Sequence, residues 1–253
     1  MRAAPWERRA AQGPIVKICG LKTSDALEAS VEAGADLAGF VFFEKSPRHL
    51  TLDAAKGLAA RAAGRILTVA LTVDAGDESL AEIIDAIRPD FLQFHGRETP
   101  ERVREAKARF KLPVIKAIGV GAAEDLVAAK AHVDADILLY DAKPSPGTPR
   151  PGGLGFPFDW SLLSEAPRER LWLLSGGLTP DTVAEALRLT GAPGVDVSSG
   201  VESSPGEKNI SRIAAFLRAA RRRARAWRHK AGCRPRRRPW RRRDPPSRRF
   251  QWP

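Results

Sequence analysis

The sequence predicts a single α/β domain: a (β/α)8 TIM barrel followed by a disordered, basic C-terminal tail. Eight short runs rich in β-branched and apolar residues alternate with segments that show a helical pattern of alanine and charge. The chain has 253 residues, and a barrel of eight such units typically needs about 250. An open doubly wound sheet is the alternative arrangement of the same units.

The predicted strands are apolar runs of five to eight residues. In chain order they cover 14–19, 37–43, 66–73, 90–94, 113–118, 136–141, 171–175 and 194–198.

A helical pattern follows each predicted strand. The predicted helices cover 24–34, 51–63, 78–87, 99–110, 122–133, 158–163, 179–191 and 209–222. The connection after the sixth strand is long, and its helix, near "FDWSLL", is short. Asn209 is expected to cap the last helix, because a side-chain amide oxygen can accept from a free N–H of the first turn.

Charge divides the chain into a barrel and a tail. The net charge is +12, but residues 218–253 hold 15 Arg and one Lys against one Asp, a net charge of +15 that leaves residues 1–217 at −3. The tail is rich in Pro and Arg without apolar periodicity, which is typical of disorder. We therefore expect a disordered N-terminal extension (1–13), a barrel (14–221) and a disordered tail (222–253).

The cellular compartment follows from cysteine use and hydropathy. Cys19 and Cys233 are far apart, which argues against a disulfide scaffold and favours a reducing cytoplasm. No apolar run approaches the roughly 20 residues of a membrane helix. The basic N-terminus lacks the apolar core of a secretion signal.

Side chains that can do chemistry stand where the predicted strands end. Each type is common there for structural reasons, since buried cysteine behaves as an apolar residue and Asp and Gly favour turns. In a barrel, however, the strand ends all face one opening, where function is expected. The strand ends carry Cys19; Arg48; Gln93 and His95; Asp141; Gly176 and Gly177; and Asp196, Ser198, Ser199 and Gly200.

The turns "SGGLTP" and "DVSSGVE" follow the seventh and eighth strands, where barrels often bind phosphate. Small residues let backbone N–H groups approach a dianion. We therefore expect Gly176, Gly177 and 198–200 to bind the phosphate of a small-molecule substrate. Arg48 could hold a second anion, such as a carboxylate, through a bidentate contact.

The motifs together resemble the phosphoribosylanthranilate isomerase family from about Val16 to Phe216. The resemblance is carried, in order, by "VKICGL", "GADLAGFVFFEKSPR", "LQFHGRE", "LLYDA", "GGLGFPFDWSLL", "LLSGGLTPDTV" and "GVDVSSGVESSPGEKN". No single motif is decisive, but their order and register are specific to this family among phosphate-binding barrels.

The resemblance implies an Amadori rearrangement of N-(5-phosphoribosyl)anthranilate to 1-(2-carboxyphenylamino)-1-deoxyribulose 5-phosphate, a step of tryptophan biosynthesis. Asp141 would be the general acid and Cys19 the general base. Arg48, Gln93, His95 and Asp196 would bind substrate. No metal or organic cofactor is implied, and we expect a monomer or homodimer without membrane or specific nucleic-acid partners.

Two other functions compete with this interpretation. Another phosphate-binding barrel, such as indole-glycerol-phosphate synthase, has similar phosphate turns but uses lysine and glutamate as acid–base groups. A nucleic-acid-binding role would rest on the Arg clusters of the tail and its Trp227, Trp240 and Trp252. A read-through or frame-shifted extension of a GC-rich gene explains the composition of the tail better.

Overall fold

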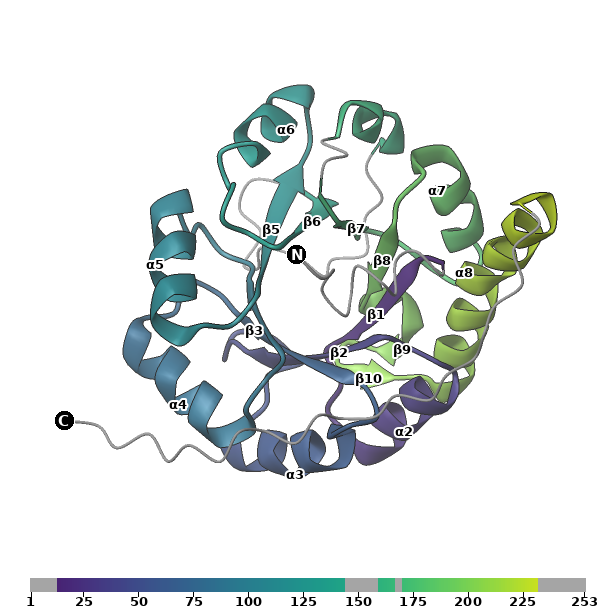
Figure 1. Ribbon diagram of the computed structural model, residues 1–253. Helices are drawn as coiled ribbons and strands as arrows, with labels where there is room; N and C mark the ends of the chain where they lie inside the picture. The colour runs from purple at the N-terminus through teal and green to yellow at the C-terminus, as the bar shows by residue number, and fades with distance from the viewer. Residues whose placement is uncertain (1–12, 144–158, 167–169, 232–253) are drawn as a thin grey trace.

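The structure, a computed structural model, describes residues 13–143, 159–166 and 170–231. Eight parallel strands form a closed barrel, and the helices surround it as an outer layer (Figure 1). The predicted (β/α)8 barrel is therefore confirmed, and the open-sheet alternative is wrong. Each strand pairs with the next along the chain, and β1 pairs with β8 to close the ring.

The eight barrel strands coincide with the predicted runs, except that β5 extends beyond its run to Val120 and β6 extends by one residue to Ala142. Their bounds are β1 (Ile15–Cys19), β2 (Leu37–Phe42), β3 (Leu67–Thr72), β4 (Phe91–Phe94), β5 (Val114–Val120), β6 (Ile137–Ala142), β7 (Trp172–Leu174) and β8 (Gly194–Val197).

The helices likewise follow the predicted pattern. Their bounds are α2 (Ser24–Glu32), α3 (Leu52–Ala62), α4 (Asp77–Ile87), α5 (Pro100–Phe110), α6 (Ala123–Ala129), α7 (Val183–Thr190) and α8 (Ile210–Ala231). The short helix after β6 is the 3-10 helix η1 (Trp160–Glu165). Thr side chains cap α2, α3 and α5, and the expected cap on α8 is present, with Asn209 Oδ1 accepting from Arg212 N at 3.0 Å.

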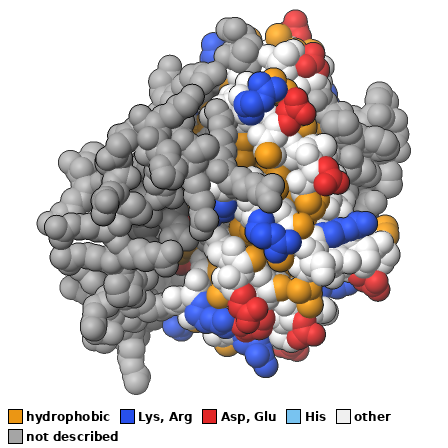
Figure 2. All heavy atoms as spheres, turned by 90° about the vertical axis from the view of Figure 1, so that its right-hand side faces the viewer, with side chains coloured by type: hydrophobic (Ala, Val, Ile, Leu, Met, Phe, Trp, Pro, Cys, Tyr) orange, Lys and Arg blue, Asp and Glu red, His pale blue; other side chains and the backbone are white. Residues whose placement is uncertain are grey.

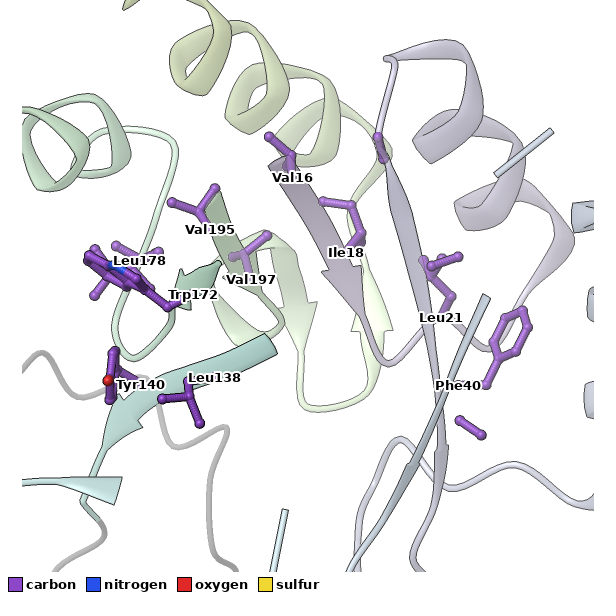
Figure 3. Close-up of a cluster of buried hydrophobic side chains, with 14 of the residues drawn as sticks. Val16, Ile18, Leu21, Phe40, Leu138, Tyr140, Trp172, Leu178, Val195 and Val197 are labelled. Carbon is purple, nitrogen blue, oxygen red and sulfur yellow. The ribbon is translucent and has the colours of Figure 1, made fainter. Parts of the chain in front are cut away.

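Side chains alternate between the two faces of the sheet. The inward face is filled below the opening by an apolar cluster: Ile15, Leu37, Val69, Phe91, Ile115, Ala117, Ile137, Leu139 and Leu173. The outward face packs against the helices, as Figure 3 shows for Val16 and Ile18 on β1 and Val195 and Val197 on β8. The interior is thus a packed core, and polar chemistry is confined to the layers above it.

Three aspartates form a repeated clamp at the N-terminal ends of the strands. Asp36, just before β2, accepts from Val16 N on β1 at 2.8 Å. Asp90, before β4, accepts from Thr68 N on β3 at 2.8 Å. Asp136 does the same for β5, accepting from Val114 N at 2.8 Å. Each clamp fixes a strand to the next one along the chain.

Two features follow β8 that the sequence analysis did not predict. They are the 3-10 helix η2 (Ser199–Val201) and the two-stranded hairpin of β9 (Glu202–Ser204) and β10 (Glu207–Lys208). The hairpin lies beside β1 and β2 at the edge of the barrel (Figure 1). Gly206, with φ +89°, faces the turn after β2, since a Cβ there would lie 2.4 Å from the Pro47 carbonyl oxygen.

Helix α8 continues to Ala231, beyond the domain boundary expected at residue 221. Arg221 on this helix binds Asp36 Oδ2 at 2.5 Å and the Pro14 carbonyl at 2.6 Å, which ties the last helix to the first strand. Of the segments expected to be disordered, 1–13 and 222–253, residues 222–231 are part of α8. Residues 1–12 and 232–253, which include most of the tail considered for nucleic-acid binding, lie outside the described residues.

The surface over α2, α7 and α8 mixes acidic, basic and apolar side chains without a large region of one charge (Figure 2). In the described part of the chain, no helix combines the length and the apolar character needed to cross a membrane.

The barrel-filling cluster gives a first prediction. Leu173 is fully buried on β7, so Leu173→Ala should lower the free energy of unfolding by about 2–5 kcal/mol through lost contacts and a residual cavity. The matched control is Leu189→Ala on α7, whose leucine is 56% exposed and should change stability by less than about 0.5 kcal/mol. Denaturant unfolding monitored by circular dichroism measures both. Equal effects of the two changes would contradict the layered core described above.

Candidate functional site

The candidate catalytic side chains lie at the C-terminal end of the barrel. Cys19 is the last residue of β1, and Asp141 stands near the end of β6. Both are nearly buried, with 4% and 6% of their surface exposed. Because both strands are parallel members of one closed ring, their ends face the same opening.

Cys19 stands directly above a buried ion pair. Lys17 lies two residues earlier on the same inward face, and its ammonium donates to Asp196 Oδ1 on β8 at 2.8 Å. Ser175, after β7, donates to the other Asp196 oxygen at 3.4 Å. The ion pair therefore joins β1 to β8 across the position where the barrel closes.

The electrostatics of these groups are coupled. Burial raises the pKa of the Cys19 thiol above its usual value; the Lys17 ammonium opposes this shift and the Asp196 carboxylate adds to it. Burial by itself would lower the pKa of Lys17. Asp196 and the Cys19 thiolate together raise the pKa by more than burial lowers it, so the net shift is upward. Lys17 therefore stays charged at neutral pH.

Asp141 is held by a second set of polar groups. Its Oδ1 accepts from Ala142 N at 2.9 Å, and its Oδ2 lies 3.3 Å from Nε2 of His95, after β4. The other ring nitrogen of His95, Nδ1, lies 3.0 Å from Gln93 Nε2. The structure thus brings three of the sequence-predicted residues, Gln93, His95 and Asp141, into one chain of contacts.

Gly176 allows β7 to approach Asp141. It has a φ of +84°, and a Cβ there would lie 2.7 Å from Ala142 N and 3.1 Å from Asp141 Oδ1. A side chain at this position would displace the carboxylate, so the glycine is needed for the position of Asp141 as well as for the turn.

The two small-residue turns expected to bind phosphate lie against each other. A Cβ on Gly200 would lie 1.8 Å from the Leu178 carbonyl oxygen, immediately after Gly176 and Gly177. Ser198 donates to the Cys19 carbonyl oxygen at 3.0 Å, and Lys208 donates to the Ser198 carbonyl at 2.9 Å. The turn after β8 is therefore fixed both to the end of β1 and to the hairpin.

Arg48 makes a bidentate ion pair. Its Nε and Nη2 donate to the two oxygens of Glu202 on β9 at 2.7 and 2.8 Å. Its side chain passes over Gly20, where a Cβ would lie 2.5 Å from Arg48 Cδ. Arg48 therefore lies over the end of β1, as an anion-binding residue near Cys19 would, but already holds one carboxylate of the protein.

Lys208 completes this cluster by donating to Glu202 Oε1 at 2.6 Å. Burial would raise the pKa of Glu202, but the hydrogen bonds and charges of Arg48 and Lys208 lower it to about 2. Burial lowers the pKa of Lys208 to about 8, against the opposing effect of Glu202. With two cations and one anion, the cluster keeps a net positive charge at neutral pH.

Among the residues described here, no group of three His, Cys, Asp or Glu side chains could hold a metal ion.

Sequence reasoning assigned no role to three residues of this site: Lys17, Glu202 and Lys208. The sequence does place Lys17 on the same face as Cys19, because it stands two residues earlier in the strand, but it does not show the pairing of Lys17 with Asp196. Glu202 and Lys208 give no such signal, since they lie in the short hairpin and their partner Arg48 is 154 residues from Glu202.

The family model described as N-(5'phosphoribosyl)anthranilate (PRA) isomerase matches residues 16–219. A protein of Rhodopseudomonas palustris (strain HaA2) named N-(5'-phosphoribosyl)anthranilate isomerase is 54% identical over 208 residues, covering 82% of this chain and 95% of that protein. A Brucella canis protein of the same name is 54% identical over 205 residues, covering 81% and 92%.

Solved structures agree with these relatives. The phosphoribosyl anthranilate isomerase of Thermotoga maritima is 34% identical and superimposes with a TM-score of 0.75, covering 82% of this chain and 98% of its own. A phosphoribosyl anthranilate isomerase solved in complex with reduced 1-(o-carboxyphenylamino)-1-deoxyribulose 5-phosphate is 32% identical, with a TM-score of 0.71 and the same coverage.

The cluster around Glu202 gives a pH-dependent prediction. The pKa of Glu202 in the folded protein is about 2, below the usual 4.5. Ionisation of Glu202 therefore stabilises the fold fully above about pH 4.5, and this stabilisation is lost as the pH falls from 4.5 toward 2. Glu202→Gln should lower the free energy of unfolding at pH 7 by about 3–5 kcal/mol, because Arg48 and Lys208 lose their buried partner.

Denaturant unfolding at a series of pH values tests this. The difference between wild type and Glu202→Gln should be constant from pH 7 to about 4.5 and shrink below that. Glu207→Gln, on the exposed side of the same hairpin, is the control and should have little effect at any pH. A difference that does not depend on pH would show that Glu202 acts through shape rather than charge.

Proposed function

The chain belongs to the N-(5'-phosphoribosyl)anthranilate isomerase family, and from this premise we propose how its residues carry out the Amadori rearrangement of tryptophan biosynthesis. The observation that carries the proposal is that Cys19 and Asp141, on β1 and β6, face one opening beside two small-residue turns. One group would act as base and the other as acid on a substrate anchored by its phosphate.

Asp141 acts as the general acid that opens the ribose ring. Its carboxylic acid gives a proton to the ring oxygen as the bond from that oxygen to C1′ breaks, and the nitrogen lone pair forms the C1′=N bond. The carboxylate left behind has two partners already in place, Ala142 N and the His95 imidazole. Both partners can donate hydrogen bonds to the negative charge that develops on the carboxylate.

Cys19 acts as the general base in the second step. Its thiolate removes the proton from C2′, and the electron pair of that bond forms C1′=C2′ while the C1′=N electrons return to nitrogen. The resulting enolamine takes a proton at C1′ and loses the proton of its C2′ hydroxyl, so that C2′ becomes the ketone and the reaction is a net isomerisation. A base fixed at the end of a strand needs no rearrangement to reach its proton.

The two ends of the substrate are anionic, and the site offers a separate location for each. The turns at Gly176–Gly177 and 198–200 would receive the phosphate through backbone N–H groups. The net positive cluster of Arg48, Glu202 and Lys208 would attract the anthranilate carboxylate, with Arg48 held in place by Glu202. Gln93 and His95, which are linked to Asp141 by contacts, would bind the substrate next to Asp141 or act on it by positioning Asp141.

The remaining expectations stay proposals. We place the reaction in the cytoplasm, without metal or organic cofactor. A phosphoribosylanthranilate isomerase of Thermotoga maritima is described as dimeric, which supports the homodimer among the two assembly states expected, monomer and homodimer.

The direct test is an assay of the purified protein with freshly prepared phosphoribosylanthranilate, followed by the loss of substrate fluorescence. Cys19→Ala and Asp141→Asn should each reduce kcat by at least about 10²-fold with the fold retained, since positioned proton transfer contributes about 10²–10⁴-fold. Circular dichroism and thermal melting confirm folding. Wild-type kcat in a folded Cys19→Ala protein would remove Cys19 from the mechanism.

A second test concerns the phosphate turns. Gly200→Ala places a methyl group 1.8 Å from the Leu178 carbonyl oxygen and must displace the turn. KM should rise by at least about tenfold, or roughly 1.4 kcal/mol of binding, and inhibition by inorganic phosphate should weaken. Gly57→Ala on α3, where a Cβ meets nothing within 4 Å, is the control and should leave both values unchanged. Unchanged phosphate inhibition in Gly200→Ala would place the phosphate elsewhere.

A further inference from the structure

The Lys17 ammonium and the Cys19 thiol converge on the same point of the barrel. That point is Gly39 on β2: a Cβ there would lie 3.0 Å from Cys19 Sγ and 3.1 Å from Lys17 Nζ. Gly39 pairs in register with Cys19, so any larger residue would displace both groups. The missing side chain therefore leaves the space in which thiol and ammonium meet.

The other neighbours of the thiol are few. Its apolar neighbours are Val41 on β2 and Leu71 on β3, with Phe43 and Val73 packed against the same cluster. Besides Lys17, the charged groups acting on it are Asp196 on β8 and the more weakly coupled Lys208 on β10. Lys208 is already paired with Glu202. Lys17 and Asp196 are thus the charges with the greatest influence on the thiol.

We propose that Lys17 and Asp196 are positioning residues that set the charge state of Cys19: Lys17 stabilises the thiolate, and Asp196 limits that effect and holds the ammonium in place. This inference rests on the proposed role of Cys19 as the base. It also assigns Asp196, expected from the sequence to bind substrate, to the protein's own ion pair.

A role in packing the barrel interior does not by itself account for the Lys17–Asp196 ion pair. Burying an ion pair is costly, and apolar residues of similar size often give equal or greater stability. The neighbouring inward positions use such residues: Ile15 is the preceding one on β1, and Leu37 is the register partner of Lys17 on β2. Charge appears on β1 only in the layer next to the thiol, where it affects chemistry.

The two charges act on the thiol in opposite directions. An opposite charge nearby favours the thiolate, whereas a like charge disfavours it. Removing Lys17 should therefore raise the pKa of Cys19. Removing Asp196 leaves the thiolate as the main anion beside Lys17 and should lower it. A purely structural role predicts no such opposition.

The experiment is a titration of Cys19 in the full-length chain carrying Cys233→Ser, which leaves one thiol. Thiolate ultraviolet absorbance against pH gives the midpoint for the parent, Lys17→Met and Asp196→Asn. We expect the midpoint to rise by about one pH unit or more in Lys17→Met and to fall by about one unit or more in Asp196→Asn, the size of shift that a neighbouring charge produces. Shifts in the same direction, or none, would overturn the proposal.

A double variant protects the test against misfolding, because each single change leaves one buried charge without its partner. Lys17→Met/Asp196→Asn leaves neither charge, and its midpoint should lie between those of the two single variants. Because Lys17 acts on the thiol more strongly than Asp196, the midpoint of the double variant should also lie above that of the parent. If the single variants do not fold, a double-variant midpoint at or below that of the parent would contradict the role of Lys17.

Kinetics separate this proposal from the proposed mechanism. If Cys19 is the base, the acidic limb of kcat against pH should move with the thiol midpoint in each variant. Opposite shifts of the midpoint with an unmoved kinetic limb would uphold the ion pair's effect on the thiol and reject Cys19 as the base. A moved limb with an unmoved midpoint would reject the role of the ion pair instead.

Discussion

Closure of the sheet between β1 and β8 is the constraint on which the site depends. Lys17 and Asp196 meet only because these two strands, 179 residues apart in this pairing, lie side by side. The same closure brings Ser198 to the carbonyl of Cys19, so the end of β1 and the turn after β8 share one rigid frame. An open sheet of the same strands would leave a lysine buried without its carboxylate.

The proposed acid and the proposed base lie in contrasting surroundings. Cys19 lies among apolar side chains with one ion pair beside it, whereas Asp141 accepts from a backbone amide and faces an imidazole. The two strand ends therefore give their side chains different electrostatic environments. The fold achieves this by giving each strand end its own neighbours.

Local sequence patterns carried the prediction of the barrel and of its strand ends, because alternation and turn residues are short-range signals. They identified Cys19 and Asp141 but not the partners of Arg48, because the Arg48–Glu202 contact spans 154 residues. The hairpin of β9 and β10 was not predicted either, because its paired residues are polar and β10 is only two residues long. Charge pairing across the closed ring is a tertiary property that one sequence does not display.

The aspartate clamps have a consequence for how the chain acquires its activity during synthesis. Each clamp joins residues 20 to 22 positions apart, so three strand pairs can form while the chain is still growing. The proposed acid–base site cannot, because Asp196 and the turn after it are made near the end. A ribosome-bound chain would therefore carry ordered strand pairs but no catalytic centre, and an unfinished polypeptide could not consume substrate.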